Sequence, residues 1–392
     1  MPWKAISLIQ ARERFVKLVL QAQISFAQCC RIFGISRKTG YKWKPRFLQG
    51  GRRGLRDRPR RPQRPRRTSA DWLKRIRALR RRHPRWGARK LRRHLQRESP
   101  WQRIPAVRTI TRWLQRWKLT SRRQPRSLPG PQVLRPVLTV PKRSNQVWTV
   151  DFKGWFKTGD GRRVEPLTVR DLFSRYILAI RLLPDQQWWR VRLVFMGLFA
   201  RYGKPTVIRV DNGFGSTGPA GLSRLSAWWT ALNIQVEFIA PGHPEQNGAH
   251  EQMHREYKAD LTAPVSSTGQ AQQRRSDRWV RIYNQVRPHE ALKQRRPAEC
   301  YRLGQPERCP TVPRLKYPKA WEVRRVRSNG QIRWRGRLRF IGEAFVGMKV
   351  GLQPAGPEKR RVYLNKVLVG EIRATDRGGI RPAKYVRQPT RT

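Results

Sequence analysis

Charge constrains this chain more than any other feature of its sequence. Its 392 residues include 88 Lys and Arg against 24 Asp and Glu, which gives a formal net charge of +64. This excess is far larger than a soluble enzyme needs, and it predicts that the chain binds polyanions. Residues 1–150 hold only four of the acidic residues, whereas residues 151–260 hold eleven. The concentration of acidic residues in 151–260 indicates where a catalytic site could lie. It disfavours a protein whose only role is to package nucleic acid.

The chain length and the cysteine spacing further limit the number of domains and the kind of protein. At about 100–200 residues per domain, the chain should form two to four modules. The four cysteines lack the paired spacing of a zinc ribbon, and we expect no disulfide framework. They are Cys29, Cys30, Cys300 and Cys309. No signal-peptide core and no apolar run of about 18 residues are present, so we expect a cytoplasmic, nucleoid-associated protein without a membrane partner.

Three helices are predicted in the first 51 residues. Apolar residues recur at helical spacing over 11–23, Ser25 can cap a second helix that ends near Gly34, and Ser36 can cap a third. This is the layout of a helix-turn-helix, whose last helix enters the major groove of DNA. Gly40 inside that helix is unfavourable by about 1 kcal/mol relative to Ala. The candidate DNA contacts on it are Arg37, Lys38, Thr39 and Lys42.

Two further segments before residue 145 are rich in arginine or proline. The run at 52–67 contains nine Arg and three Pro, so it cannot build a core and predicts a linker. Helical periodicity returns over 69–117, with Arg on the opposing faces, and predicts a second helical DNA-binding unit. Pro-rich sequence from Pro125 to Pro141 indicates another linker. For either helical unit, a charged packing domain is the alternative.

From residue 147 the pattern becomes β-rich, with the runs VWTVDF, VEPLTVRD and YILAIRLL. An apolar helix follows at 187–200, and then strands and helices alternate up to a long helix that starts around Asn247. This order predicts a layered α/β domain with a mixed sheet. Beyond about residue 310, alternating runs and the hairpin signal Asn329-Gly330 predict a small basic all-β barrel.

Three acids of the α/β segment fall where a crevice is expected. Asp151 is inside the first strand, Asp211 ends the fourth, and Glu251 is in the first turns of the last helix. Because the carboxyl ends of neighbouring strands open onto one crevice, these acids can converge. Oxygen ligands select Mg²⁺ or Mn²⁺, and two such ions about 3.5–4 Å apart can promote phosphodiester cleavage and transfer. Arg255 and Lys258 share the helical face of Glu251 and could bind the phosphates.

A rival interpretation rests on His250-Glu251-Gln252-Met253-His254, which matches the zinc-protease pattern H-E-x-x-H. A pattern with three fixed positions matches easily by chance. The extended form would need Gly at position 257 and His at position 260, where this chain has Tyr257 and Asp260. We therefore expect no zinc.

Several segments in order resemble the motifs of the DDE transposase and retroviral-type integrase core, most closely those of bacterial insertion-sequence transposases. They are VWTVDFKGWF, VRDLFSRYILAI, VIRVDNGFG, APGHPEQNGAHEQMHREYK and YNQVRPHEAL. SFAQCCRIFGISRKTGYKWKPRF is similar to the N-terminal helix-turn-helix of the same transposases. The resemblance implies an RNase H-like fold in which Asp151, Asp211 and Glu251 bind the metal. Asp171 matches a recurrent position outside the triad, which we interpret as structural.

One departure from the family pattern is the longer spacing between Asp211 and Glu251. The Gly/Ser-rich residues 213–223 can absorb the difference as a loop. The resemblance implies an enzyme that cleaves element ends and joins the freed 3′-hydroxyl to target DNA, working as a homo-oligomer on double-stranded DNA. The alternative is a catalytically inactive DNA-binding regulator derived from a transposase, which the three intact acids disfavour.

The predicted division of the chain follows from these patterns. In order, we expect a helix-turn-helix domain at 1–51, an Arg/Pro-rich linker at 52–68, a second helical DNA-binding domain at 69–122, a linker at 123–144, an RNase H-like catalytic core at 145–302, a linker at 303–319 and a small basic β-barrel at 320–385.

Overall fold

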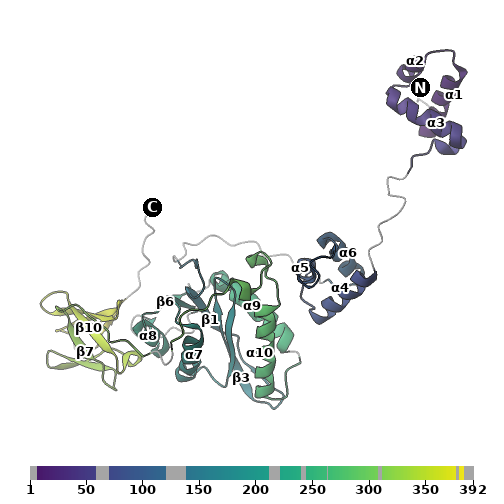
Figure 1. Ribbon diagram of the computed structural model, residues 1–392. Helices are drawn as coiled ribbons and strands as arrows, with labels where there is room; N and C mark the ends of the chain where they lie inside the picture. The colour runs from purple at the N-terminus through teal and green to yellow at the C-terminus, as the bar shows by residue number, and fades with distance from the viewer. Residues whose placement is uncertain are drawn as a thin grey trace, which may run out of the picture. The chain divides into compact units, whose positions relative to one another are not determined.

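The computed structural model describes residues 7–58, 70–120, 138–211, 221–239, 244–262, 264–307, 311–376 and 379–383. The chain divides into two compact units, Met1–Ser69 and Ala70–Thr392 (Figure 1). Most of the predicted Arg/Pro-rich linker and of the linker at 123–144 lies outside the described residues. No helix of the described part is long and apolar enough to cross a membrane.

The first unit is a three-helix bundle made of α1 (Leu8–Gln21), α2 (Phe26–Ile32) and α3 (Arg37–Gly54). The two predicted caps are confirmed. The Ser25 hydroxyl accepts a hydrogen bond from a backbone N–H in the first turn of α2, and the Ser36 hydroxyl does the same for α3. These side chains satisfy N–H groups that have no partner within the helix. The local sequence therefore determines where each helix begins.

Gly40 allows α3 to approach α1 and α2 closely. A Cβ atom at this position would lie 2.8 Å from the ring of Phe15, 2.9 Å from the Cys30 sulfur and 2.9 Å from the ring of Phe26. Real Cβ atoms do not come this close to other heavy atoms. The glycine that lowers helix propensity is therefore required by the packing of the bundle.

Replacing Gly40 by Ala should lower the free energy of unfolding of the first unit by about 1–3 kcal/mol, the usual cost of overpacking. Gly50 is the matched control, because no atom lies within 4 Å of a Cβ placed there. Gly50→Ala should raise the free energy of unfolding by up to about 1 kcal/mol through helix propensity alone. Urea unfolding of residues 1–69, followed by circular dichroism, measures both. Equal effects of the two substitutions would contradict the packing argument.

The second unit begins with three helices, α4 (Ala70–Arg82), α5 (Ala88–Glu98) and α6 (Val107–Arg116). They pack around one apolar cluster. Its buried members include Trp72, Ile76, Trp86, Leu91, Leu95, Ile110 and Leu114. The predicted second helical segment is confirmed, since the residues that set its periodicity are the ones that become buried.

A mixed sheet follows, as the sequence predicts, and it has six strands. β1 pairs antiparallel with β3 and parallel with β5, and β5 pairs parallel with β6. The order is β2-β3-β1-β5-β6, with β4 also paired to β3. The strands are β1 (Val147–Phe152), β2 (Phe156–Lys157), β3 (Arg163–Asp171), β4 (Ile177–Leu183), β5 (Val207–Val210) and β6 (Gln235–Phe238).

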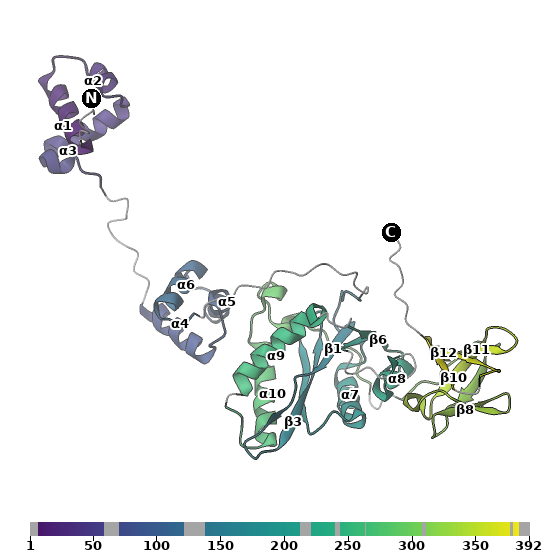
Figure 2. The same ribbon diagram turned by 180° about the vertical axis from the view of Figure 1, so that it is seen from behind.

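Helices cover both faces of this sheet (Figures 1 and 2). Trp148 and Val150 of β1 share a core with α7 and α8, whereas Ile177 and Ile180 of β4 share one with α9 and α10. Because side chains alternate along a strand, Thr149 and Asp151 face the α9 side. The helices are α7 (Trp188–Tyr202), α8 (Arg224–Ala231), α9 (Gly248–Leu261), α10 (Gly269–Gln285) and α11 (Pro297–Cys300).

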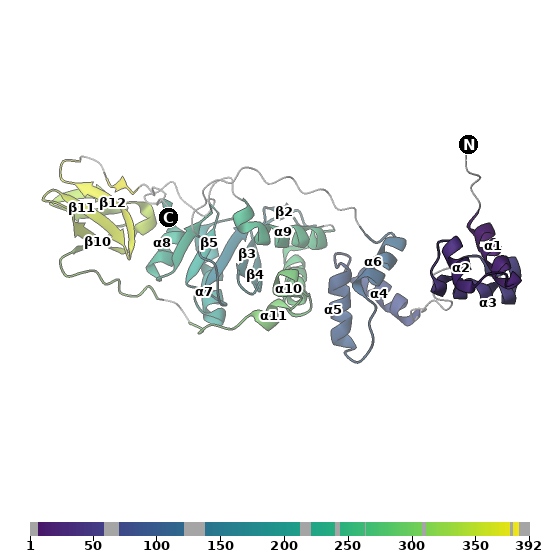
Figure 3. The ribbon, with the colours of Figure 1, turned by 90° about the horizontal axis from the view of Figure 1, so that it is seen from above.

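The C-terminal region is all-β, as predicted, but its described strands do not pair into one closed barrel. They form a five-stranded sheet, β13-β12-β11-β10-β7, and a separate hairpin of β8 and β9; β10, β11 and β12 lie side by side in Figure 3. The strands are β7 (Glu322–Arg325), β8 (Gln331–Trp334), β9 (Arg337–Phe340), β10 (Lys349–Pro354), β11 (Lys359–Leu364), β12 (Val367–Arg373) and β13 (Arg381–Pro382).

The hairpin signal at Asn329-Gly330 marks a turn between β7 and β8, which are not partners in a sheet. The hairpin turn is instead Arg335-Gly336, and both residues have positive φ angles, 48° and 72°. Two successive residues of this kind form a type I′ turn, whose twist matches that of the flanking strands. The prediction placed the hairpin at the wrong turn because β7 finds its partner in β10, a strand further along the chain.

Candidate active site

Asp151 and Asp211 occupy matching positions on neighbouring strands. β1 and β5 are parallel, and Val150 pairs with Val210, so the next residue along each chain is one of the two acids. Adjacent strands lie about 4.8 Å apart. Both acids therefore come to the same edge of the sheet, on the face opposite the apolar side chains of Val150 and Val210.

Glu251 joins them from α9, where it is exposed in the first turn. The electrostatics of Asp151 record the proximity of all three carboxylates. The pKa of Asp151 is raised to about 7, first by burial and then by the negative charges of Asp211 and Glu251, against the lowering effects of the Phe152 backbone N–H and the Lys153 charge. The structure thus brings the three predicted acids into one electrostatic neighbourhood.

Carboxylate oxygens are the ligands that Mg²⁺ and Mn²⁺ prefer. Among the residues that the structure describes, no three His, Cys, Asp or Glu side chains lie close enough together to hold one ion. Burial is the first cause of the raised pKa of Asp151, and the negative charges of Asp211 and Glu251 add to it; a bound cation would offset all three effects. The donor chemistry at this edge therefore fits a divalent cation, with the three acids as its candidate ligands.

A positive surface adjoins the acids. Glu251, Arg255 and Lys258 are all exposed on α9, as their spacing predicts. Lys153, which follows the end of β1, was missed by sequence reasoning. Burial lowers the pKa of Lys153, the charge of Lys258 lowers it further, and Asp151 raises it. Lys153 and Lys258 are thus close enough to repel each other, and a phosphate between them would be attracted to both.

The two histidines of the H-E-x-x-H string form hydrogen bonds inside the protein. His250 is fully buried, with Nδ1 2.9 Å from the Thr149 hydroxyl and Nε2 2.6 Å from the Thr168 hydroxyl. His254 Nε2 lies 2.7 Å from the same Thr168 oxygen. Burial lowers the pKa of His254 to about 3 and that of His250 well below its usual value, so both are neutral near pH 7. This environment does not favour the protease interpretation, because both ring nitrogens of His250 already have partners.

Protein-family models match most of the chain. Integrase core domain models match residues 141–244 and 232–297, a helix-turn-helix domain matches 11–63, and a homeodomain-like domain matches 39–114. Residues 321–377 match the C-terminal domain of IS481 family transposases. Residues 141–297 of the chain thus match integrase core domain models. The resemblance to insertion-sequence transposases that the motifs indicate is thereby confirmed.

Two curated insertion-element proteins are similar to the chain. It is 30% identical over 188 residues to the IS407 uncharacterized 31.7 kDa protein of Burkholderia multivorans, covering 45% of this chain and 62% of that protein. It is 31% identical over 159 residues to the IS476 uncharacterized 39.2 kDa protein of Xanthomonas euvesicatoria, covering 40% and 44%. The chain thus spans less than two thirds of the length of either relative.

Solved structures of retroviral integrase cores are also similar. The HTLV-2 integrase catalytic core domain, in complex with magnesium, has a TM-score of 0.31 and 15% identity, covering 41% of this chain and 99% of that one. The BIV integrase core has a TM-score of 0.29 and 18% identity, covering 40% and 93%.

Asp171 lies away from the edge where the acids meet, at the far end of β3. It is fully buried and accepts hydrogen bonds from the backbone N–H groups of Asn145 and Ser174, each at 2.8 Å. These bonds join the segment before β1 to the turn after β3. The contacts agree with our interpretation of Asp171 as structural.

The YNQVRPHEAL motif of the integrase core has a different location from the acids. Asn284 binds both backbone groups of Ile177, with its side-chain oxygen accepting and its nitrogen donating at 2.9 Å each. Arg287, which is buried, pairs with Glu256 of α9. The motif therefore connects α10 to β4 through hydrogen bonds, and it contacts α9 through an ion pair.

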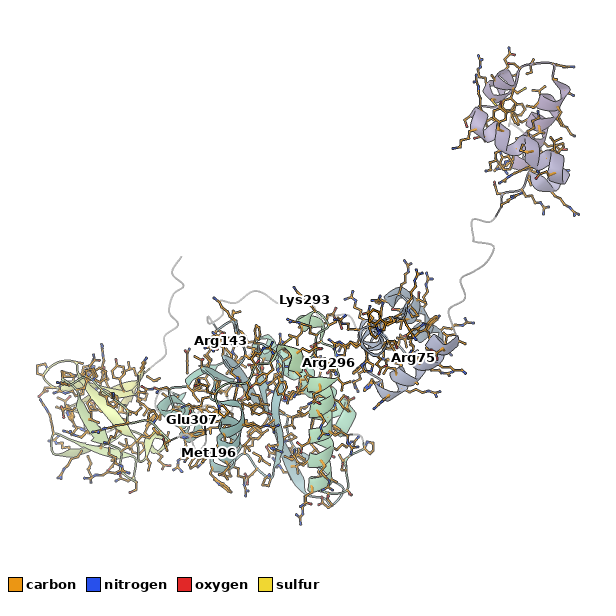
Figure 4. All side chains as sticks on the ribbon, viewed as in Figure 1. Arg75, Arg143, Met196, Lys293, Arg296 and Glu307 are labelled. Atoms are coloured by element: carbon orange, nitrogen blue, oxygen red, sulfur yellow. The ribbon has the colours of Figure 1, made fainter. Side chains whose placement is uncertain are left out.

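One cavity of about 670 Å³ is basic but lies at the opposite end of β1 from Asp151. Lys142, Arg143 and Arg302 line it together with Glu307, which pairs with Lys204. Arg143 and Glu307 are labelled in Figure 4. This cavity contains none of the three acids, so it is not the candidate active site.

The candidate DNA contacts of the first unit lie at the start of α3. Arg37, Lys38 and Lys42 are exposed. The Thr39 hydroxyl lies 2.9 Å from the Ser36 hydroxyl, within the cap of the helix. Arg37, Lys38 and Lys42 are therefore accessible to DNA, whereas the Thr39 hydroxyl is engaged in the cap of the helix.

Proposed function

We propose that the chain is a transposase that cleaves DNA at element ends and transfers the freed 3′-hydroxyl ends into target DNA with the help of Mg²⁺ or Mn²⁺. Asp151, Asp211 and Glu251 are the proposed ligands. The observation that carries this proposal is the register of β1 and β5, which brings Asp151 and Asp211 to the same end of neighbouring strands within residues that match an integrase core domain; the charge of Glu251 on α9 also acts on Asp151. Strand-transfer assays on variants of the three acids test it.

The proposed site combines ligand residues with phosphate-binding residues. Divalent ions, when bound, stabilise the attacking and leaving oxygens of an in-line displacement. Lys153 and Lys258 bind the non-bridging oxygens of the phosphate to be cut, since both are positive, Lys153 interacts with Asp151 and Lys258 interacts with Lys153. The buried location of Asp151 keeps water away from one side of its carboxylate, which strengthens its attraction for cations.

The other domains bind the DNA on which the proposed active site acts. In this proposal α3 reads a sequence at the element end through the major groove, and the second helical segment and the basic C-terminal sheets bind phosphates. Two element ends must be joined to one target, so the working form is a homo-oligomer assembled on double-stranded DNA.

The dependence of the reaction on Mg²⁺ should change with pH. A carboxyl whose pKa is raised to about 7 is mostly protonated below that pH, and a proton competes with the metal. Lowering the pH from 7 to 6 should therefore raise the half-saturating Mg²⁺ concentration by up to about tenfold. Between pH 8 and 9 it should change little. Strand-transfer rates titrated with Mg²⁺ at each pH measure this, and a half-saturating concentration that is flat from pH 6 to 9 would contradict it.

A further inference from the structure

Buried hydrogen bonds hold α9 against the sheet beside the three acids. We name His250 and His254 of α9, Thr149 of β1 and Thr168 of β3 the histidine–threonine cluster. The Thr168 hydroxyl is its centre, with His250 Nε2 at 2.6 Å, His254 Nε2 at 2.7 Å and the backbone oxygen of Asp151 at 2.9 Å. This single oxygen connects the helix of Glu251 to the strand of Asp151.

The number of hydrogen-bond donors in the cluster determines which nitrogen of each imidazole carries the proton. A hydroxyl donates one hydrogen and accepts two. The Thr168 hydroxyl donates to the Asp151 carbonyl, which can only accept, so both imidazoles donate to Thr168 from Nε2–H. His250 Nδ1 then carries no proton and accepts from the Thr149 hydroxyl at 2.9 Å, the shorter of two contacts that compete for this hydrogen, since the Arg170 carbonyl lies 3.5 Å from the same hydroxyl. Each hydrogen-bonding position of the Thr168 hydroxyl is used.

The same assignment determines whether His254 can donate a hydrogen bond to the Asp151 carboxylate. His254 Nδ1 lies 3.6 Å from a carboxylate oxygen of Asp151. With its proton on Nε2, this imidazole has nothing to donate to Asp151 from Nδ1. The carboxylate is therefore close to a histidine without being neutralised by it, and it stays available to a cation.

A further hydrogen bond to β3 holds the first turn of α9. Arg170 of β3 is buried, with 1% of its surface exposed, and its guanidinium donates to the backbone oxygen of Ala249 at 2.7 Å. Ala249 is two residues before Glu251. Arg170 and the cluster thus hold α9 at the turn from which Glu251 projects.

We propose that the histidine–threonine cluster is a positioning device that fixes Glu251 relative to Asp151, so that both carboxylates can bind one set of cations. This inference rests on the proposed function. Successive residues of a helix are about 100° apart, so the buried histidines at i and i+4 direct the intervening Glu251 towards solvent. The H-E-x-x-H string then consists of one ligand and two residues that orient the helix carrying it.

The test compares Thr168→Val with Thr168→Ser in the full-length chain without DNA. Valine has nearly the shape of threonine but lacks the hydroxyl, whereas serine keeps it. Mn²⁺ binding, followed by the electron paramagnetic resonance of free Mn²⁺, should weaken by roughly 10–100-fold in Thr168→Val, as is typical when support of a metal ligand is lost. Thr168→Ser should recover most of the affinity. A merely structural threonine would lower the melting temperature without changing the Mn²⁺ concentration at half saturation.

A second pair of variants serves if Thr168→Val does not fold. His254→Gln retains an N–H donor towards Thr168, and His254→Leu removes it, so only the leucine variant should lose Mn²⁺ affinity. Folded Thr168→Val or His254→Leu protein with wild-type Mn²⁺ binding would overturn the inference. Stoichiometric zinc that is lost in His254→Leu would also overturn it, because the histidines would then be ligands themselves.

Glu251→Gln, measured alongside, separates this inference from the proposed function. If Glu251→Gln weakens Mn²⁺ binding and Thr168→Val does not, the ligand assignment stands and the positioning role is wrong. If Glu251→Gln itself leaves Mn²⁺ binding unchanged, the proposed metal site is wrong, and the cluster has no ligand to position.

Discussion

Asp151→Asn, Asp211→Asn and Glu251→Gln should each reduce DNA cleavage and strand transfer by about three orders of magnitude or more in Mg²⁺. Each change removes one charged ligand from a site that is expected to supply several kcal/mol of transition-state stabilisation. DNA binding should remain nearly unchanged, because one charge is small against a net charge of +64. Labelled oligonucleotides carrying the element end measure cleavage, transfer and binding in parallel.

Asp277→Asn is the control for these variants. Asp277 lies on α10, is half-exposed and pairs with Arg181 at the surface at 3.5 Å. Such pairs contribute about 0–1 kcal/mol to stability, so this variant should keep its activity. Substantial strand transfer by any of the three acid variants would show that the triad assignment is wrong. Wild-type protein that binds the ends but never cleaves them, in Mg²⁺ or Mn²⁺, would favour the inactive-regulator alternative.

The DNA affinity of residues 1–120 should fall by about 10³–10⁵-fold between 50 and 200 mM salt, if six to ten phosphates are contacted. The physical reason is the release of counterions from DNA as Lys and Arg neutralise its phosphates. Arg37→Ala should lower the steepness of the salt dependence by about one unit if Arg37 contacts a phosphate. If it contacts a base instead, Arg37→Ala should relax sequence preference and leave the steepness unchanged. Fluorescence anisotropy across a salt series measures both properties.

Lys17→Ala is the matched control for Arg37→Ala. Lys17 is an exposed basic residue on α1, where it pairs with Glu13 at 3.1 Å, and it is not on the proposed recognition helix. Its removal should change neither the steepness of the salt dependence nor the sequence preference. A selection experiment in which residues 1–120 recover no preferred sequence would contradict the sequence-reading role of this region.

Much of the fold could be predicted because its signals are local. The caps at Ser25 and Ser36 involve atoms a few residues apart, and helical or alternating periodicity directly reflects which side chains become buried. The positions of Asp151, Asp211 and Glu251 at strand ends and in a first helical turn follow from the same patterns. Their convergence was a reasonable expectation because strand ends meet at one edge of a sheet.

Other properties depend on residues far apart in the chain, and only the tertiary structure decided them. Gly40 was unfavourable by helix propensity, yet its missing Cβ is what lets Phe15 and Cys30 pack against α3. β7 pairs with β10 rather than with β8, which moves the hairpin to Arg335-Gly336.

The clearest case is the H-E-x-x-H string. By sequence alone, its histidines were either zinc ligands or residues without a role. In the fold, α9 packs on β1 and β3, and the hydroxyls of Thr149 and Thr168 meet both imidazoles. Sequence spacing places His250 and His254 on one helical face, but only packing determines what that face contacts. The sequence by itself therefore determined the order of the domains and the candidate acids, whereas tertiary contacts decided what surrounds those acids.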